Sequence, residues 1–208
     1  MNKESVLGII QSISAKMTEN RDYLIKLDQV NGDGDLGISM SDGYKAAAEF
    51  VEQSEEKDLG KLIMATGKAF NASAPSSLGT ITTFGFMGIA KALKGKEEVD
   101  FAEAAQAMKA GVDNIMVKAG SKTGEKTILD SLYPGAEALV ENSEDPATAV
   151  EKAAQAAADG SEATKEMRAV HGRAAYSAER SIGILDGGSV VGRLVFEGIR
   201  DYYVQKHS

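Results

Sequence analysis

The residues with the clearest chemical potential are three clustered aspartates, Asp28, Asp33 and Asp35. They lie within a stretch of eight residues, glycines separate them, and no basic residue between Leu27 and Gly37 neutralises their charge. Crowded carboxylates repel one another, so each would titrate upward or turn into solvent unless a hard, oxygen-seeking cation held them together. We therefore interpret the cluster as a candidate site for Mg²⁺ or Ca²⁺.

Two other interpretations compete with a magnesium site. Asp, Asn and Gly are the commonest turn residues, so Asn31-Gly32 alone would indicate only a tight turn. An EF-hand loop beginning at Asn31 would place Asp42 at its last position, but Leu36 stands where the sharp turn of that loop needs glycine. We favour Mg²⁺, because it needs few carboxylates and completes its shell with water and phosphate oxygens.

A second candidate segment, rich in hydroxyl groups, leads into a predicted helix. Residues 71–80 include Ser76, Ser77, Gly79 and Thr80. The unpaired amides of a helix N-terminus form an anion site, although serines there more often act only as caps. An adjacent metal changes that balance, because a metal-bound phosphate needs N–H donors for its remaining oxygens. The segment is therefore a candidate phosphate-binding loop.

A third loop, residues 120–127, superficially resembles a P-loop. A glutamate interrupts the Gly-Lys pair of that motif, and a helical stripe rather than a strand precedes the loop, so we reject a Walker A motif. Gly124, Lys126 and Thr127 still lie where a helix begins and can present amides and a hydroxyl to a nucleotide. Asp130 needs no role beyond that of a first-turn charge favoured by the helix dipole.

A fourth polar segment, residues 171–189, brings basic side chains and glycines back late in the chain, among them Arg173, Asp186 and Gly187. Its simplest interpretation is a solvated turn before the last helix. Basic side chains and glycines at this point are nevertheless what a nucleotide site needs in order to close over ribose and phosphate.

Composition limits the chemistry and the environment open to the chain. Its 208 residues carry a formal charge of −8, which argues against a nucleic-acid partner, and the absence of cysteine excludes disulfides and thiolate metal sites. With only two histidines, a histidine-rich zinc site is excluded. The N-terminus lacks the apolar core of a signal peptide, and no apolar run approaches the roughly 20 residues of a membrane span. We expect a cytoplasmic protein without membrane contact and a single domain over residues 1–208.

Apolar residues recur at helical spacing through almost the whole sequence, and no segment alternates with the period of a strand. The fold class predicted is therefore all-α, a barrel or bundle of about eight antiparallel helices whose loops form a polar mouth at one end. The eight stripes lie at residues 6–17, 40–51, 59–70, 78–93, 101–116, 128–140, 146–170 and 190–202.

Four blocks, in this order, resemble the nucleotide-binding L subunit of dihydroxyacetone kinases over almost the whole chain. The blocks are Leu27–Met40, Ser76–Thr80, Gly124–Leu132 and Gly172–Gly188. The resemblance implies an eight-helix barrel whose loop ends bind ADP or ATP through two Mg²⁺ ions, with the three clustered aspartates as metal ligands. It also implies a set of nucleotide contacts: Ser76, Ser77, Gly79 and Thr80 at the phosphates, Gly124, Thr127 and Ile128 along the border, and Arg173, Asp186 and Gly187 near base and ribose.

The resemblance further implies partners. Such subunits present the nucleotide to a separate K subunit, which holds dihydroxyacetone on a histidine. Some exchange ATP, and others keep ADP, which a phosphotransferase-system M subunit rephosphorylates in place. A chain of this length favours the M subunit mode, and a homodimer is left open.

Two departures from the family pattern bear on the substrate. The family commonly has His where this chain has Leu36 and Pro where it has Gly187, so another keto sugar such as a tetrulose is an alternative substrate. The nucleotide domain of fatty-acid kinases, which shares the metal motif, and a nucleotide-sensing regulatory subunit without activity are further alternatives.

Overall fold

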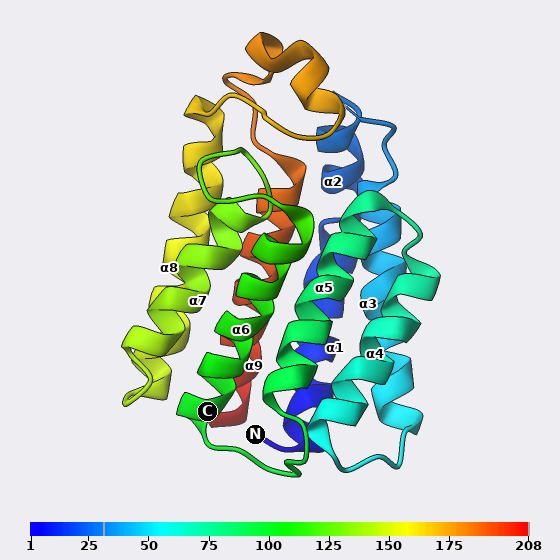
Figure 1. The fold of residues 1–208 in the computed structure, drawn as a ribbon, viewed down its shortest axis with the longest axis vertical. Helices are drawn as coiled ribbons and strands as arrows, with labels where there is room; N and C mark the ends of the chain where they lie inside the picture. Colours follow the sequence, from blue (N-terminus) through cyan, green and yellow to red (C-terminus); the bar gives the residue numbers. More distant parts are fainter. Residues whose placement is uncertain (31, 208) are drawn as a thin grey trace.

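The computed structural model describes residues 1–30 and 32–207, except for the side chains of Arg173, Ser177 and Arg180. The described residues form nine α-helices and two 3₁₀-helices and contain no β-strand (Figure 1). Among them, no helix combines the length and the apolar character that crossing a lipid bilayer requires. The elements are α1 Lys3–Glu19, α2 Arg21–Asp28, α3 Leu36–Gln53, α4 Leu59–Ser73, α5 Ser77–Ala92, α6 Phe101–Ala119, α7 Leu129–Glu141, α8 Pro146–Ala163, η1 Thr164–Glu166, η2 Arg173–Ser181 and α9 Gly187–His207.

The eight long helices close into a ring in which each packs against the next. Helix α1 contacts α3, the order then continues from α3 to α9, and α9 returns to α1. Successive long helices run in opposite directions (Figure 1). Each helical stripe in the sequence corresponds to one long helix, and the predicted all-α antiparallel eight-helix barrel is confirmed.

The helices differ from the prediction in two places. Helix α2 is not predicted, because Leu24 is its only buried residue and one residue gives no periodic signal. Helix α8 ends at Ala163, although the alanine-rich stretch predicts a helix to Val170. The Thr164 hydroxyl donates to the Ser161 carbonyl at 2.6 Å and accepts a distant backbone N–H, and this tertiary contact accompanies the turn out of the helix.

Short polar side chains fix where several helices begin. In each case the side chain accepts the backbone N–H three residues further on, which satisfies one of the free donors of the first turn. Such a cap contributes about 1 kcal/mol, so these boundaries are encoded locally. The capping residues are Asn2, Asp58, Ser76, Asp100 and Asp145.

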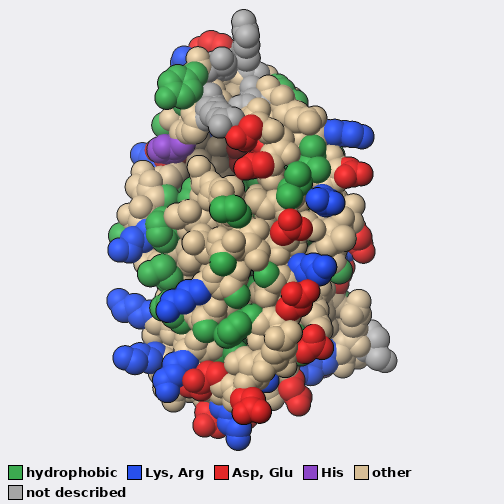
Figure 2. Space-filling view, turned by 90° about the vertical axis from the view of Figure 1, so that its right-hand side faces the viewer, with side chains coloured by type: hydrophobic (Ala, Val, Ile, Leu, Met, Phe, Trp, Pro, Cys, Tyr) green, Lys and Arg blue, Asp and Glu red, His purple; other side chains and the backbone are tan. Residues whose placement is uncertain are grey.

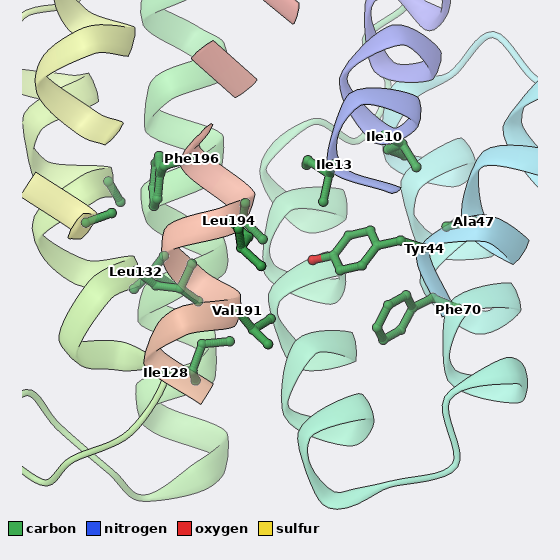
Figure 3. Packing of buried hydrophobic residues seen from close by; sticks show 14 of the residues in the cluster. Ile10, Ile13, Tyr44, Ala47, Phe70, Ile128, Leu132, Val191, Leu194 and Phe196 are labelled. Atoms are coloured by element: carbon green, nitrogen blue, oxygen red, sulfur yellow. The ribbon is translucent and has the colours of Figure 1, made fainter. Parts of the chain in front are cut away.

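Apolar side chains from all eight long helices fill the inside of the ring. Tyr44 and Phe70 meet edge to face with ring centroids 5.0 Å apart, and Leu132, Val191 and Leu194 pack on the α7 and α9 side (Figure 3). A cavity of about 340 Å³ with a mainly apolar lining from α1, α5, α6 and α9 remains within the barrel. The apolar core thus stabilises the arrangement of the helices, and the candidate polar site residues lie in the loops that connect them.

Four connections gather at one end of the barrel, and both termini lie at the other (Figure 1). The gathered connections are residues 29–35, 74–76, 120–128 and 164–186. Acidic side chains lie near this end on the face shown in Figure 2. The antiparallel order alone explains the gathering, because every second connection returns to the same end. All four polar segments singled out in the sequence are therefore neighbours in the fold.

Candidate functional site

Helix α2 and the loop after it bring the three aspartates together. Asp28 ends α2, its Oδ2 accepts the Gly34 N–H at 2.7 Å, and its carbonyl oxygen accepts the Gly32 N–H at 2.6 Å. These bonds fold the loop back over Asp28, and Gly34 has a φ of +77°, which glycine adopts without steric cost. As a result, one carboxylate oxygen from each of Asp28, Asp33 and Asp35 lies within 4.8 Å of the others.

This arrangement fits a hard divalent cation. Two oxygens on opposite sides of Mg²⁺ are about 4.2 Å apart, and across Ca²⁺ the separation is roughly 4.6–5.2 Å. A spread of at most 4.8 Å therefore needs only a small closure to hold Mg²⁺. Asp33 and Asp35 are exposed and Asp28 is half-buried, which leaves room for water or phosphate as further ligands.

The EF-hand alternative is wrong. Such a loop supplies a backbone carbonyl ligand from its seventh position before the next helix is under way, but α3 already begins at Leu36, the sixth position counted from Asn31. Asn31 itself lies outside the described residues.

The N-terminus of α5 lies beside the aspartate loop. Ser76 Oγ accepts the Gly79 N–H at 3.0 Å and donates to Ser39 Oγ at 3.2 Å, and Ser39 lies in the first turn of α3. Gly79 is buried, and a β-carbon there would lie only 1.9 Å from a backbone carbonyl oxygen. Ser77 and Thr80 are exposed at this end. Because the first amides of α5 have no acceptor within the helix, the segment offers N–H donors to an anion close to the carboxylates.

The loop before α7 is organised by Asp130. Its buried carboxylate accepts the Gly124 N–H at 2.5 Å and the Thr127 N–H at 2.7 Å. Thr127 Oγ1 in turn accepts the Leu129 N–H at 3.2 Å, and the helix begins there, directly after the buried Ile128. The interpretation of Asp130 as only a first-turn charge is therefore wrong, because its side chain fixes the loop.

Asp186 forms the start of α9. Its Oδ2 accepts the Ser189 N–H at 2.7 Å, and its own N–H donates to Thr164 Oγ1 at 3.0 Å. Burial raises the pKa of the Asp186 carboxyl to about 6, against the opposing effect of the Ser189 N–H. The side chain of Arg173, another predicted contact in this segment, is outside the part of the chain that the structure describes.

Direct packing joins the start of α9 to the other loops. A β-carbon at Gly187 would lie 2.6 Å from Leu36 Cδ2, so the start of α9 rests on the first residue of α3. A β-carbon at Gly188 would lie 3.2 Å from the Ile128 nitrogen. The structure thus brings the described members of the predicted nucleotide set together beside the aspartates, and their contact with a nucleotide stays a prediction.

Two contacts in this region have no clear sequence signal. Lys126, which sequence reasoning places only at a helix start, is buried and donates to backbone carbonyls of the 164–186 segment. His171 Nε2 lies 2.7 Å from Glu125 Oε2, and this contact with His171 lowers the pKa of Glu125 to about 2. Both contacts link residues 38 or more positions apart only in the folded chain, so neither the glycine-framed loop nor the isolated His171 reveals them.

Comparison with known proteins places the chain in a family. The DAK2 domain matches residues 30–201, and the chain belongs to the DAK2 domain family.

Three relatives of the chain are kinases or kinase subunits. The chain is 30% identical over 198 residues to the ADP-binding subunit DhaL of PEP-dependent dihydroxyacetone kinase 1 from Listeria innocua, covering 95% of this chain and 96% of that one. It is 30% identical over 171 residues to the corresponding Escherichia coli subunit, covering 81% of each. It is also 25% identical over 201 residues to an L-erythrulose 1-kinase of Mycolicibacterium smegmatis, covering 95% of this chain but 35% of that longer protein.

A solved structure has the same fold. The dihydroxyacetone kinase of C. freundii, in complex with AMP-PNP and Mg²⁺, superposes with a TM-score of 0.76 at 20% identity. The match covers 94% of this chain and 33% of that one. At this identity the likeness supports the helical barrel itself.

Proposed function

We propose that residues 1–208 form one nucleotide-binding domain, the subunit of a dihydroxyacetone kinase that presents Mg²⁺-bound ADP or ATP for phosphoryl transfer. The observation that carries the proposal is the set of three carboxylate oxygens within 4.8 Å, beside the N-terminus of α5. The two ADP-binding subunits named above support it, because their sequences align with most of this chain.

The chemistry asked of this chain is positioning and charge neutralisation. Bound Mg²⁺, two ions in this proposal, would neutralise charge on the β and γ phosphate oxygens. Asp28, Asp33 and Asp35 would hold the metal, and the first amides of α5 would donate to phosphate oxygens. Gly124, Thr127 and Ile128 border the nucleotide. No general base from this chain is required, because the attacking hydroxyl belongs to a substrate held elsewhere.

The substrate and the phosphoryl donor depend on partners. We propose that a K subunit holds the ketose and that an M subunit of the phosphotransferase system rephosphorylates bound ADP, since the two ADP-binding subunits described above belong to kinases named PEP-dependent. A tetrulose kinase role is a second candidate. Relatives named as erythrulose kinases and the apolar Leu36 beside the aspartates favour it.

Calorimetric titration of the purified chain with ADP in the presence and absence of Mg²⁺ tests the proposal. Binding should require Mg²⁺, and Asp33→Asn should weaken it on the order of 100-fold by removing one charged ligand. Asp42→Asn is the matched control, because Asp42 is an exposed aspartate nearby in sequence that lies on α3, outside the cluster. Its affinity should equal that of the wild type.

Two results would count against the proposal. ADP binding that does not depend on Mg²⁺ would show that the three carboxylates take no part in the site. Absence of ADP binding would show that the chain is not a nucleotide-binding subunit. A coupled assay with candidate K subunits, run with ATP or with a phosphoenolpyruvate-fed relay and with dihydroxyacetone or erythrulose, then identifies donor and substrate.

A further inference from the structure

Lys126 is a buried lysine whose ammonium is surrounded by backbone carbonyl oxygens. Its side chain lies in the loop before α7, and the whole residue is 6% exposed. Its Nζ donates to the carbonyl oxygens of Thr164 and Ser181 at 2.6 Å each and of Ile184 at 2.7 Å, with that of Met167 at 3.3 Å. Among the described residues, no carboxylate forms an ion pair with it. A set of carbonyls around a single positive charge resembles the environment of a bound monovalent cation.

The position of Lys126 is conformationally costly, which indicates that its contacts matter. Its φ is +60°, and it is the only non-glycine residue with a positive φ among the described residues. Residues held in this region persist only where the surrounding structure fixes them, and they concentrate at functional sites. Burial also lowers the pKa of the ammonium, an effect that the nearby charges of Asp186 and Asp130 oppose.

The carbonyls that Lys126 contacts all belong to one segment. Residues 164–186, here called the cap, run from the end of α8 through η2 to Asp186 and lie across the loop end of the barrel (Figure 1). A second contact joins the cap to the loop before α7, where His171 Nε2 lies 2.7 Å from Glu125 Oε2. Within the cap, Ser181 Oγ accepts the Ala169 N–H at 3.0 Å, so the last residue of η2 is held to the segment that precedes η2.

We propose that Lys126 is a positioning residue that latches the cap onto the loop before α7 and thereby fixes both sides of the nucleotide site. Its backbone neighbour Thr127 belongs to the loop, and its Ile184 contact lies two residues before Asp186. Holding the ammonium in the carbonyl cage therefore sets the spacing between the 124–128 edge and the start of α9. This proposal rests on the nucleotide-binding function proposed above and assigns one residue to the closed form of that site.

Lys126→Met tests the latch, because methionine keeps an unbranched side chain and removes the charge and all three donors. Lys122→Met is the matched control, since Lys122 is an exposed lysine of the same loop. Amide hydrogen exchange should accelerate across residues 168–183 in Lys126→Met while α3 to α6 exchange as in the wild type. Release of a fluorescent ADP analogue in Mg²⁺ should accelerate on the order of tenfold, with little change in association rate.

A chemical rescue separates the latch from general structural damage. Lys126→Ala leaves space for an alkylammonium ion, so propylammonium should restore slow cap exchange and slow ADP release. Propanol, a neutral molecule of the same shape, is the control and should restore neither. The same titration serves if Lys126→Met does not fold, because rescue is measured within one variant. Saturable rescue by the cation alone supports the cage.

The outcomes distinguish this proposal from the one on which it rests. If the wild-type chain does not bind ADP with Mg²⁺, the proposed function fails, and cap exchange alone decides the latch. If the wild type binds but Lys126→Met exchanges its cap and releases ADP at wild-type rates, the latch is refuted and the proposed function stands. Equal rescue by propylammonium and propanol also refutes it.

Discussion

Replacement of Asp186 by asparagine should stabilise the protein at neutral pH and leave it unchanged in acid. The Asp186 carboxyl caps α9 through the Ser189 N–H, and it lies in a setting that disfavours its charge. Burial raises its pKa from 3.8 to about 6, assisted by the charge of Asp130 and opposed by the Ser189 N–H and the Lys126 ammonium. Asparagine keeps an oxygen for the cap and removes the charge.

The sign and size follow from proton linkage. Between pH 3.8 and about 6 the folded state holds a proton on Asp186 that the unfolded state has lost, so wild-type stability falls as pH rises through this window. A shift of about two units corresponds to at most about 3 kcal/mol, and partial exposure of the carboxyl reduces that figure. For a chain of this length the difference in Tm between variant and wild type should therefore widen by roughly 4–10 °C from acid to neutral pH.

Urea and thermal unfolding of the wild type and of Asp186→Asn, each at pH 4.0 and 7.5, measure how the stability difference between the two proteins changes with pH. Groups that titrate equally in both proteins cancel in this comparison. Asp145→Asn is the control, because Asp145 caps α8 but hydrogen bonds to Thr148 lower its pKa. Its contribution is present above pH 3.8 and is lost only as pH falls through a still lower value, so its effect should hardly change over this range. A stability difference for Asp186→Asn that stays constant with pH would refute the reasoning.

Four further substitutions test packing around the site. Gly187→Ala should lower stability, because its β-carbon would lie 2.6 Å from Leu36 Cδ2, and Leu36→Ala should relieve part of that loss; additive losses in urea unfolding would contradict the contact. Gly79→Ala should cost about 1–3 kcal/mol and weaken ADP binding, since the β-carbon would lie 1.9 Å from the Ala74 carbonyl oxygen; unchanged Tm and ADP affinity would show that the turn adapts. Leu36→His should reduce stability and shift activity toward dihydroxyacetone in the coupled assay. An unchanged substrate profile would show that residue 36 does not determine which ketose is used.

Several features of the molecule can be predicted from local sequence because they depend on residues a few positions apart. A helix repeats its buried face every three or four residues, so the eight apolar stripes predict the eight long helices. A cap acts over three residues, so Ser76 and Asp145 mark where α5 and α8 begin. The aspartate cluster is likewise visible because its three carboxylates lie within eight residues of sequence.

Other features depend on residues that meet only when the ring closes. Lys126 reaches the Ser181 carbonyl across 55 positions, and its burial is invisible in a polar, glycine-framed loop. In the sequence, Asp130 cannot be distinguished from any other acidic residue in the first turn of a helix. Only the folded structure shows that its carboxylate accepts the Gly124 and Thr127 N–H groups. The short α2 has one buried residue and lacks the periodic signal of a longer helix.

The sequence by itself therefore determined the helical ring, the ends of many of its helices and the acidic cluster, since periodicity, capping and charge repulsion all act over short distances along the chain. Tertiary structure decided which loops meet, that Leu36 and Gly187 touch, that the Asp186 carboxyl resists ionisation and that Lys126 enters a cage of carbonyls. These properties arise from burial and contact between distant segments, and no local pattern specifies the surroundings of a side chain before the helices pack.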